Sequence, residues 1–247
     1  MTAFHVVSFF SAILASVCSV PEYCEKRLER DRDYDNATIT NSSYIGKEIL
    51  YVNLQSCAQK CLTYRCACSA IFHNSQMGTC VLLSATLDPQ SIGSGPIEGD
   101  WEYYTTPKGC EPGWLEYSTH CYFIGQTEVT WMEAKSECEA RCSHLVEIQT
   151  KEESDWLAET FVFKDTCPSN IFDFCRAWTG GNDLRTEGRY QWNNANESMA
   201  FTNWESNEPS ITYPFQAKYS DCIHLLRNGN WNDIPCSTKT NFICEKA

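Results

Sequence analysis

The sequence lacks any long apolar run beyond its first segment. The stretch from Phe4 to Val17 is apolar but shorter than the roughly 18 residues that a membrane span needs, and no later run approaches that length. Small residues and then Pro21-Glu22-Tyr23 follow it, which is the shape of a signal peptide. We therefore predict a signal peptide over residues 1–19, no membrane span, and secretion to the extracellular space. The alternative is an anchored N-terminus, because no Lys or Arg precedes the apolar stretch.

Basic residues are also scarce. The chain has 19 Lys and Arg against 32 Asp and Glu, a formal charge of −13. Such a chain repels phosphate backbones, which argues against nucleic acid as a partner. Signatures of catalysis are missing as well: there is no His-Glu-x-x-His, no Gly-x-Ser-x-Gly and no phosphate-cradling glycine loop. These absences favour a binding protein over an enzyme.

Cysteine, in contrast, is abundant, with 16 in 247 residues. A reducing cytosol would leave these as reactive thiols, so disulfides formed in a secretory pathway are expected. Three glycosylation sequons, at Asn36, Asn41 and Asn196, agree with that route. Loss of the signal peptide would remove Cys18 and leave 16 − 1 = 15 cysteines. An odd number implies a free thiol or an interchain bridge, so a disulfide-linked or non-covalent homo-oligomer is a hypothesis.

The spacing of the cysteines divides the mature chain into two blocks. Pro107 and Gly109 interrupt the chain between them, so we place a linker at 107–109, a first domain at 20–106 and a second at 110–247. The first block holds Cys24, Cys57, Cys61, Cys66, Cys68 and Cys80. Their pairing is not readable from the sequence.

The first block predicts a helix against a hairpin. Apolar residues at helical spacing indicate a helix over 52–64, and strands are expected at 69–72 and 79–83 around a turn. Cys57 and Cys61 share one helix face, so two bridges can pin the helix to the hairpin. A zinc site is the alternative, although no His lies at ligand spacing beside these cysteines.

Three motifs of this block resemble those of PAN/apple domains. They are the run Leu54-Gln-Ser-Cys57-Ala-Gln-Lys-Cys61-Leu62, the pair Cys66-Ala-Cys68, and Gly78-Thr-Cys80-Val-Leu-Leu83. The resemblance implies a small α+β module, of a kind that is secreted and binds proteins or glycans.

The second block predicts two helices followed by strands and loops. Thr130-Trp-Met-Glu133 and Thr150-Lys-Glu-Glu153 are capping boxes, and the second opens a helix that contains Trp156 and Phe161. From Ala177 onward the chain alternates strands with long loops that are rich in Asn, Ser, Glu and Gly. Aromatic residues embedded in these loops indicate ordered structure.

The second block resembles C-type lectin-like domains over almost all of 110–247. The motifs that carry the resemblance are Cys110-Glu-Pro-Gly-Trp114, Cys121-Tyr-Phe, Trp131-Met-Glu-Ala134, Cys138, His144-Leu-Val-Glu-Ile148, Ala177-Trp-Thr-Gly-Gly181, Glu208-Pro-Ser210, Asp221-Cys222, Trp231-Asn-Asp233, Cys236 and Phe242-Ile-Cys244. The resemblance implies a disulfide-stapled α+β fold with two helices, two small antiparallel sheets and a long loop region.

The resemblance also implies three disulfides, Cys138–Cys244, Cys222–Cys236 and Cys110–Cys121. Three cysteines fall outside that pattern. Cys167 and Cys175 are close enough in sequence to close a local loop, which leaves Cys142 as the candidate odd thiol.

The family's sugar-binding calcium site maps onto oxygen-bearing residues of this chain. Calcium takes six to eight oxygen ligands, and the matching positions here are Glu208, Ser210, Asn232 and Asp233. The resemblance implies that two vicinal sugar hydroxyls complete the Ca²⁺ shell and that the same side chains hydrogen-bond them, with a cis peptide before Pro209. An aromatic such as Tyr213 is a candidate to pack on the sugar ring.

Two departures from the family pattern bear on function. The tripeptide is Glu-Pro-Ser, so the sugar class is not readable from it, and Ser220 stands where an acidic residue is usual. Asp183, Glu187 and Asp221 match an auxiliary calcium site. The sequence favours a secreted, calcium-dependent lectin that binds glycans or glycoproteins. The alternative is a sugar-independent adhesion or extracellular-matrix protein that binds protein partners or mineral.

Overall fold

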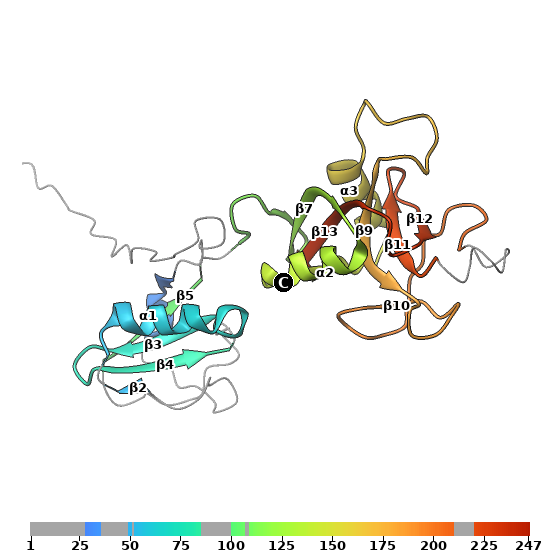
Figure 1. Cartoon of the computed structure of the whole chain (residues 1–247). Coiled ribbons are helices and arrows are strands. Elements are labelled where there is room, and N and C mark those ends of the chain that lie inside the picture. The colour runs from blue at the N-terminus through green and yellow to red at the C-terminus, as the bar shows by residue number, and fades with distance from the viewer. Residues whose placement is uncertain (1–27, 36–48, 51, 85–99, 107–108, 210–219) are drawn as a thin grey trace, which may run out of the picture. The chain divides into compact units, whose positions relative to one another are not determined.

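The structure is a computed structural model that describes residues 28–35, 49–50, 52–84, 100–106, 109–209 and 220–247 (Figure 1). The chain divides into two compact units, 1–108 and 109–247, and each is described by itself. The expected signal peptide, both N-terminal sequons, Asn36 and Asn41, and the site residues Ser210 and Tyr213 lie outside the described residues. Within the described part of the chain, no helix has the length and apolar character needed to cross a bilayer.

The N-terminal unit is an antiparallel sheet with one α-helix against it. The strand order is β1-β5-β3-β4-β2, and β3 and β4 form the expected hairpin. In Figure 1, α1 lies along β3 and β4. The strands are β1 (Glu29–Arg30), β2 (Ile49–Leu50), β3 (Ala70–Asn74), β4 (Thr79–Leu83) and β5 (Trp101–Thr105), and the helical segments are η1 (Arg32–Tyr34), α1 (Leu54–Thr63) and η3 (Arg65–Ala67).

Helix α1 begins at a side-chain cap and is fixed by two disulfides. The Asn53 side chain accepts a hydrogen bond from the backbone N–H of Ser56 at 2.8 Å, which satisfies one free donor of the first turn. Cys57–Cys80 ties the helix to β4, and Cys61–Cys68 ties it to the segment before β3. The zinc alternative is therefore wrong, because these thiols are consumed in bridges.

The C-terminal unit is built on one connected sheet. The strands expected as two small antiparallel sheets are joined through β9 and β13, which are parallel, while the other pairs are antiparallel. The strands are β6 (Leu115–Tyr117), β7 (His120–Val129), β8 (His144–Leu145), β9 (Arg176–Asn182), β10 (Gln191–Trp192), β11 (Cys222–Leu226), β12 (Trp231–Ile234) and β13 (Thr240–Lys246), and the helices are α2 (Trp131–Ala140), α3 (Lys151–Leu157) and the π-helical turn η4 (Ala158–Val162).

Both helices start where the capping signals predict. At α2 the box is complete: Thr130 and Glu133 each bond the other's backbone N–H. At α3 one of the two capping hydrogen bonds is present: the Thr150 side chain accepts from the Glu153 N–H. The Glu153 carboxylate does not bond the Thr150 N–H and points into the core instead. Its two oxygens accept from the Tyr122 hydroxyl at 2.6 Å and from a backbone N–H at 2.8 Å. The α-helix ends at Leu157, earlier than expected, and continues as η4.

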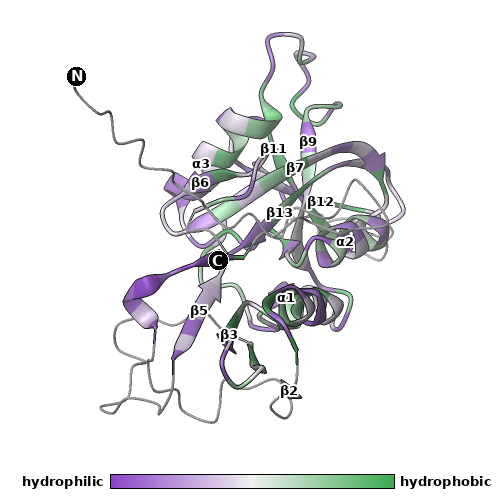
Figure 2. Ribbon diagram, turned by 90° about the vertical axis from the view of Figure 1, so that its left-hand side faces the viewer, coloured by the Kyte–Doolittle hydropathy of each residue, from purple (hydrophilic) through white to green (hydrophobic). Residues whose placement is uncertain are grey.

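The sheet separates two cores. Alternate side chains of a strand face opposite sides, and in β11 Cys222 enters the core beside α2 while Ile223 and Leu225 enter the core beside α3. Figure 2 shows hydrophobic and hydrophilic residues alternating around α1 and α2, as expected for helices with one buried face. Fully buried Trp178 belongs to the first core, and fully buried Trp231 belongs to the second.

The C-terminal unit contains the disulfides Cys110–Cys121, Cys138–Cys244, Cys167–Cys175 and Cys222–Cys236. They include the three pairs that the resemblance implies and the local loop between Cys167 and Cys175. The expectation for Cys142 is wrong: it is disulfide-bonded, and none of the described cysteines is free. Cys142 therefore gives no support to a disulfide-linked oligomer. Close spacing in the chain indicates the Cys167–Cys175 loop, but it indicates no partner for Cys142.

Candidate metal-binding site

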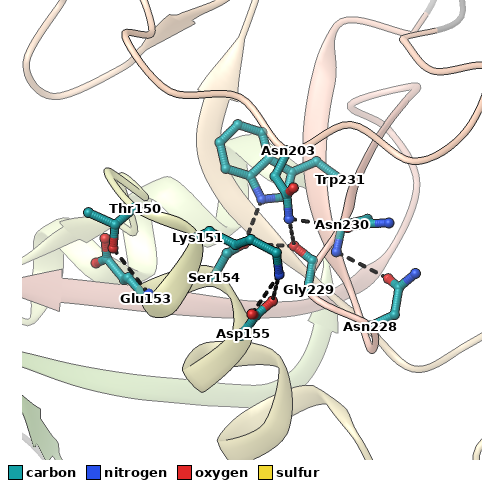
Figure 3. Close-up of polar contacts among 10 residues, drawn as sticks. All are labelled: Thr150, Lys151, Glu153, Ser154, Asp155, Asn203, Asn228, Gly229, Asn230 and Trp231. Atoms are coloured by element: carbon teal, nitrogen blue, oxygen red, sulfur yellow. Dashed lines mark hydrogen bonds and ion pairs between the residues drawn. The ribbon is translucent and has the colours of Figure 1, made fainter.

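Strand β12, which carries Asn232 and Asp233, is fixed to α3 at its first residue. The indole N–H of Trp231 donates to the Ser154 hydroxyl at 2.8 Å, and that hydroxyl donates to the Gly229 carbonyl at 2.7 Å (Figure 3). Trp231 is fully buried and packs edge-on against other aromatic rings of its core, including Trp204 at 6.1 Å. The strand that bears two predicted ligands thus begins at a rigid point of the core.

A loop that carries Glu208 lies beside the start of β12. The backbone N–H of Trp231 donates to the Asn203 carbonyl, and the Glu205 N–H donates to the Trp231 carbonyl, both at 2.8 Å. The chain then turns, with the Glu208 N–H donating to the Glu205 carbonyl at 2.9 Å, and the Glu208–Pro209 peptide bond is cis. Asn203 and Glu205 are therefore attached by their backbone to the first residue of the strand that carries Asn232 and Asp233, and Glu208 follows three residues later.

The Asp233 carboxylate is held by Tyr190. Asp233 is buried, and its Oδ2 accepts a hydrogen bond from the Tyr190 hydroxyl at 2.8 Å. Burial and the neighbouring negative charge of Asp233 raise the pKa of Tyr190, so the hydroxyl stays protonated and remains a donor. The Tyr190 ring also packs against Trp204 at 4.8 Å. Tyr190 thereby fixes the orientation of a predicted ligand.

Acidic side chains gather around Asp183 at the end of β9. Asp183 is buried, its Oδ2 accepts from the Gly188 N–H at 2.7 Å, and its N–H donates to the Asp221 carbonyl at 3.0 Å. Burial raises the pKa of Asp183 to about 6, and the charges of Glu187, Asp221 and Asp233 add to the rise. Burial, followed by the charge of Asp233, also raises the pKa of Asp221. The three auxiliary-site residues and Asp233 thus lie within electrostatic reach of one another.

The oxygen atoms gathered at this site suit a hard cation as its ligands. Oδ1 of Asp183 and Oδ1 of Asn232 are buried, and neither has a hydrogen-bond partner among the described residues. Buried acceptors without donors are rare in proteins, and each loses the solvation that water gave it. Calcium coordinates carboxylate and amide oxygens, so it would satisfy both atoms and offset the crowded negative charge. Among the described residues, no group of three or more His, Cys, Asp or Glu side chains is placed to hold a metal ion by itself.

Only some of the predicted site residues are shown together. Asn232 and Asp233 are neighbours on β12, and the charges of Asp233, Glu187 and Asp221 all act on Asp183. Glu208 follows the loop paired with β12, and the positions of Ser210 and Tyr213 are outside the described residues. No local sequence signal indicates the roles of Tyr190 and Glu205, because their hydrogen-bond partners are distant in the chain.

We expect Asp183→Asn to stabilise the calcium-free protein at neutral pH. The pKa of Asp183 is higher in the folded chain, about 6, than its ordinary 3.8. Folding therefore retains a proton between these values, and stability falls as pH rises through about 4 to 6. The amide removes this charge while its oxygen still accepts from Gly188. Denaturant unfolding with chelator should give the variant about 1–2 kcal/mol more stability at pH 7.

The advantage of Asp183→Asn should vanish at pH 4, where the wild-type carboxyl is protonated. The exposed Asp173→Asn is the matched control and should show no such difference. A gain of equal size at both pH values would contradict the electrostatic cause.

Comparison with known proteins finds relatives of the C-terminal unit. A family model, the lectin C-type domain, matches residues 127–246. A perlucin-like protein of Mytilus galloprovincialis is 31% identical over 143 residues, which cover 57% of this chain and 85% of that protein. A solved structure, the mouse scavenger receptor C-type lectin carbohydrate-recognition domain, is 30% identical, with 56% of this chain and 98% of that chain covered and a TM-score of 0.48. The cow C-type carbohydrate-recognition domain of CD23 is 27% identical, with 56% and 95% covered and a TM-score of 0.46.

The chain therefore belongs to the C-type lectin domain family. The family match falls within the C-terminal unit, 109–247, and contains the strands and loops of the candidate site.

Proposed function

We propose that this protein is a secreted, calcium-dependent lectin that binds glycans or glycoproteins through its C-terminal unit. Glu208, Ser210, Asn232 and Asp233 are the proposed ligands of the sugar-binding ion. Asp183, Glu187 and Asp221 are the proposed ligands of an auxiliary ion. The observation that carries the proposal is the buried Asn232 Oδ1, to which none of the described residues donates, next to an Asp233 carboxylate that Tyr190 orients.

The proposed site residues make different contacts with the sugar. The chemistry that bound calcium supplies is coordination of two vicinal sugar hydroxyls. The Glu208 and Asp233 carboxylates accept hydrogen bonds from those hydroxyls, and the Asn232 amide donates one. Tyr213 packs its ring on the apolar face of the sugar. The protein binds its ligand without turning it over.

The rest of the chain supports extracellular use of this site. We propose that the N-terminal unit is a PAN/apple-like binding module and that Asn36, Asn41 and Asn196 carry glycans. Asn196 is exposed in the turn after β10, where a glycan has access. Single sugar sites bind weakly, so presentation of several sites together, for example in a non-covalent homo-oligomer, would raise avidity.

Retention on immobilised sugars tests the proposal. The full chain is passed over mannose and galactose resins with calcium and is then eluted with a chelator. We expect retention on at least one resin and release by the chelator. Calcium binding measured by calorimetry without retention on either resin would instead favour the alternative, a sugar-independent adhesion or matrix protein.

A further inference from the structure

We infer that Glu205 is a positioning residue for the proposed calcium site: its carboxylate holds the loop that carries Glu208 in register with the turn that leads into β12. The inference rests on the proposed function and concerns a residue that binds neither ion nor sugar.

The proposed ligands come from two different parts of the fold. Asn232 and Asp233 lie on β12, inside the sheet, whereas Glu208 lies on a loop that leaves the sheet after Trp204. An ion held by both parts requires that they keep a fixed spacing. Two backbone hydrogen bonds to Trp231 set that spacing at the start of the loop, but the chain continues past them before it reaches Glu208.

The Glu205 side chain adds a second connection between the loop and the turn before β12. Its Oε2 accepts hydrogen bonds from the Asn228 amide at 2.6 Å and from the Asn230 amide at 3.0 Å. Its Oε1 accepts from the Ser206 N–H at 2.9 Å. These bonds lower the pKa of Glu205, the bond from Ser206 most of all, so the carboxylate is ionised and each bond is charge-assisted. One carboxylate therefore joins the loop to two residues of the turn before β12.

The turn to which Glu205 is joined is itself rigid. Gly229 has φ +81°, and an added Cβ would lie 2.6 Å from Asp155 Oδ1 on α3, so the turn is packed closely against that helix. The Gly229 carbonyl accepts from both Ser154 and Asn203, as Figure 3 shows. The Asn230 N–H donates to Asn228 Oδ1 at 3.1 Å, which orients the Asn228 amide toward the carboxylate. Glu205 thus attaches the loop to a point that does not move with it.

Two substitutions distinguish the effect of the length of the Glu205 side chain from the effect of its charge. Glu205→Asp keeps the negative charge but shortens the side chain by one methylene, so it loses the bonds to Asn228 and Asn230. Glu205→Gln keeps the length and one acceptor oxygen for both Asn amides, but it removes the charge and the oxygen that accepts from the Ser206 N–H. Glu116→Ala, an exposed glutamate on the edge strand β6, is the matched control.

Calcium affinity is measured by calorimetry on the full chain, together with thermal unfolding. We expect Glu205→Asp to weaken calcium binding about three- to tenfold, and Glu205→Gln to stay within about twofold of wild type. Melting temperatures without calcium should hardly change, since Glu205 lies outside both cores. Hydrogen exchange, also without calcium, should be faster at the Glu205 and Glu208 amides in Glu205→Asp alone.

The opposite result would overturn the inference. If Glu205→Gln loses calcium affinity while Glu205→Asp keeps the wild-type affinity, the residue acts only through its charge. Unchanged exchange and affinity in both variants would overturn it as well. If the wild-type chain binds no calcium, the proposed function fails and the positioning role with it, whereas the exchange comparison still reports whether Glu205 fixes the loop.

Discussion

Asp233→Asn should weaken calcium binding by at least about tenfold and abolish retention on a glycan resin. The substitution removes one negative charge at a residue proposed to bind both the ion and a sugar hydroxyl. It keeps the shape of the side chain, and its amide oxygen can still accept the hydrogen bond that Tyr190 donates to Asp233. The fold should therefore survive, which isolates the effect on binding.

Calorimetric titration with calcium and resin retention measure this effect. Asp165→Asn is the control, because Asp165 is exposed in the segment after η4 and should behave as wild type. Circular dichroism checks that both variants are folded. Undiminished calcium affinity in Asp233→Asn would remove β12 from the proposed site.

Removal of the Cys138–Cys244 bridge should cost far more stability than removal of Cys167–Cys175. The first bridge closes a loop of 106 residues, and the second closes one of 8. In the chain-entropy account, the longer loop contributes about 5 kcal/mol and the shorter about 2.5 kcal/mol. Since domains are stable by only about 5–15 kcal/mol, loss of the first should leave the C-terminal unit at the edge of unfolding.

The paired variants Cys138→Ala/Cys244→Ala and Cys167→Ala/Cys175→Ala test this by denaturant unfolding. Alanine avoids placing a hydroxyl in the core, where Cys138 and Cys244 are fully buried. Equal losses in the two double variants would show that loop closure is not the main contribution of these bridges.

Local signals in the sequence predicted local structure well. The caps at Thr130 and Thr150 mark the starts of α2 and α3, and the apolar spacing after Asn53 marks α1. These features depend on residues within one or two helical turns of each other. The inward turn of Glu153 was not predictable, because its partner Tyr122 lies 31 residues away in the chain.

Long-range pairing limited the prediction of the sheet and the site. No local sequence signal indicates that β9 and β13 lie side by side and parallel, so the expectation of two separate sheets is wrong. Tyr190 and its partner Asp233 are 43 residues apart, and Glu205 reaches Asn228 across 23. The family resemblance indicates the positions of the proposed ligands. It does not indicate Tyr190 and Glu205, which hold those ligands in place.

The attachment of β12 to Trp231 and α3 has a consequence for how this protein can acquire new ligands. Substitutions at Asn232 or Asp233 that do not keep the shape of the side chain alter a strand that begins at the fully buried Trp231, so they act on folding as well as on recognition. Changes around Glu208 act on a loop joined to the core by only a few hydrogen bonds. Under the proposed function, sugar preference can therefore diversify through the loop, while β12 keeps the proposed calcium ligands in place.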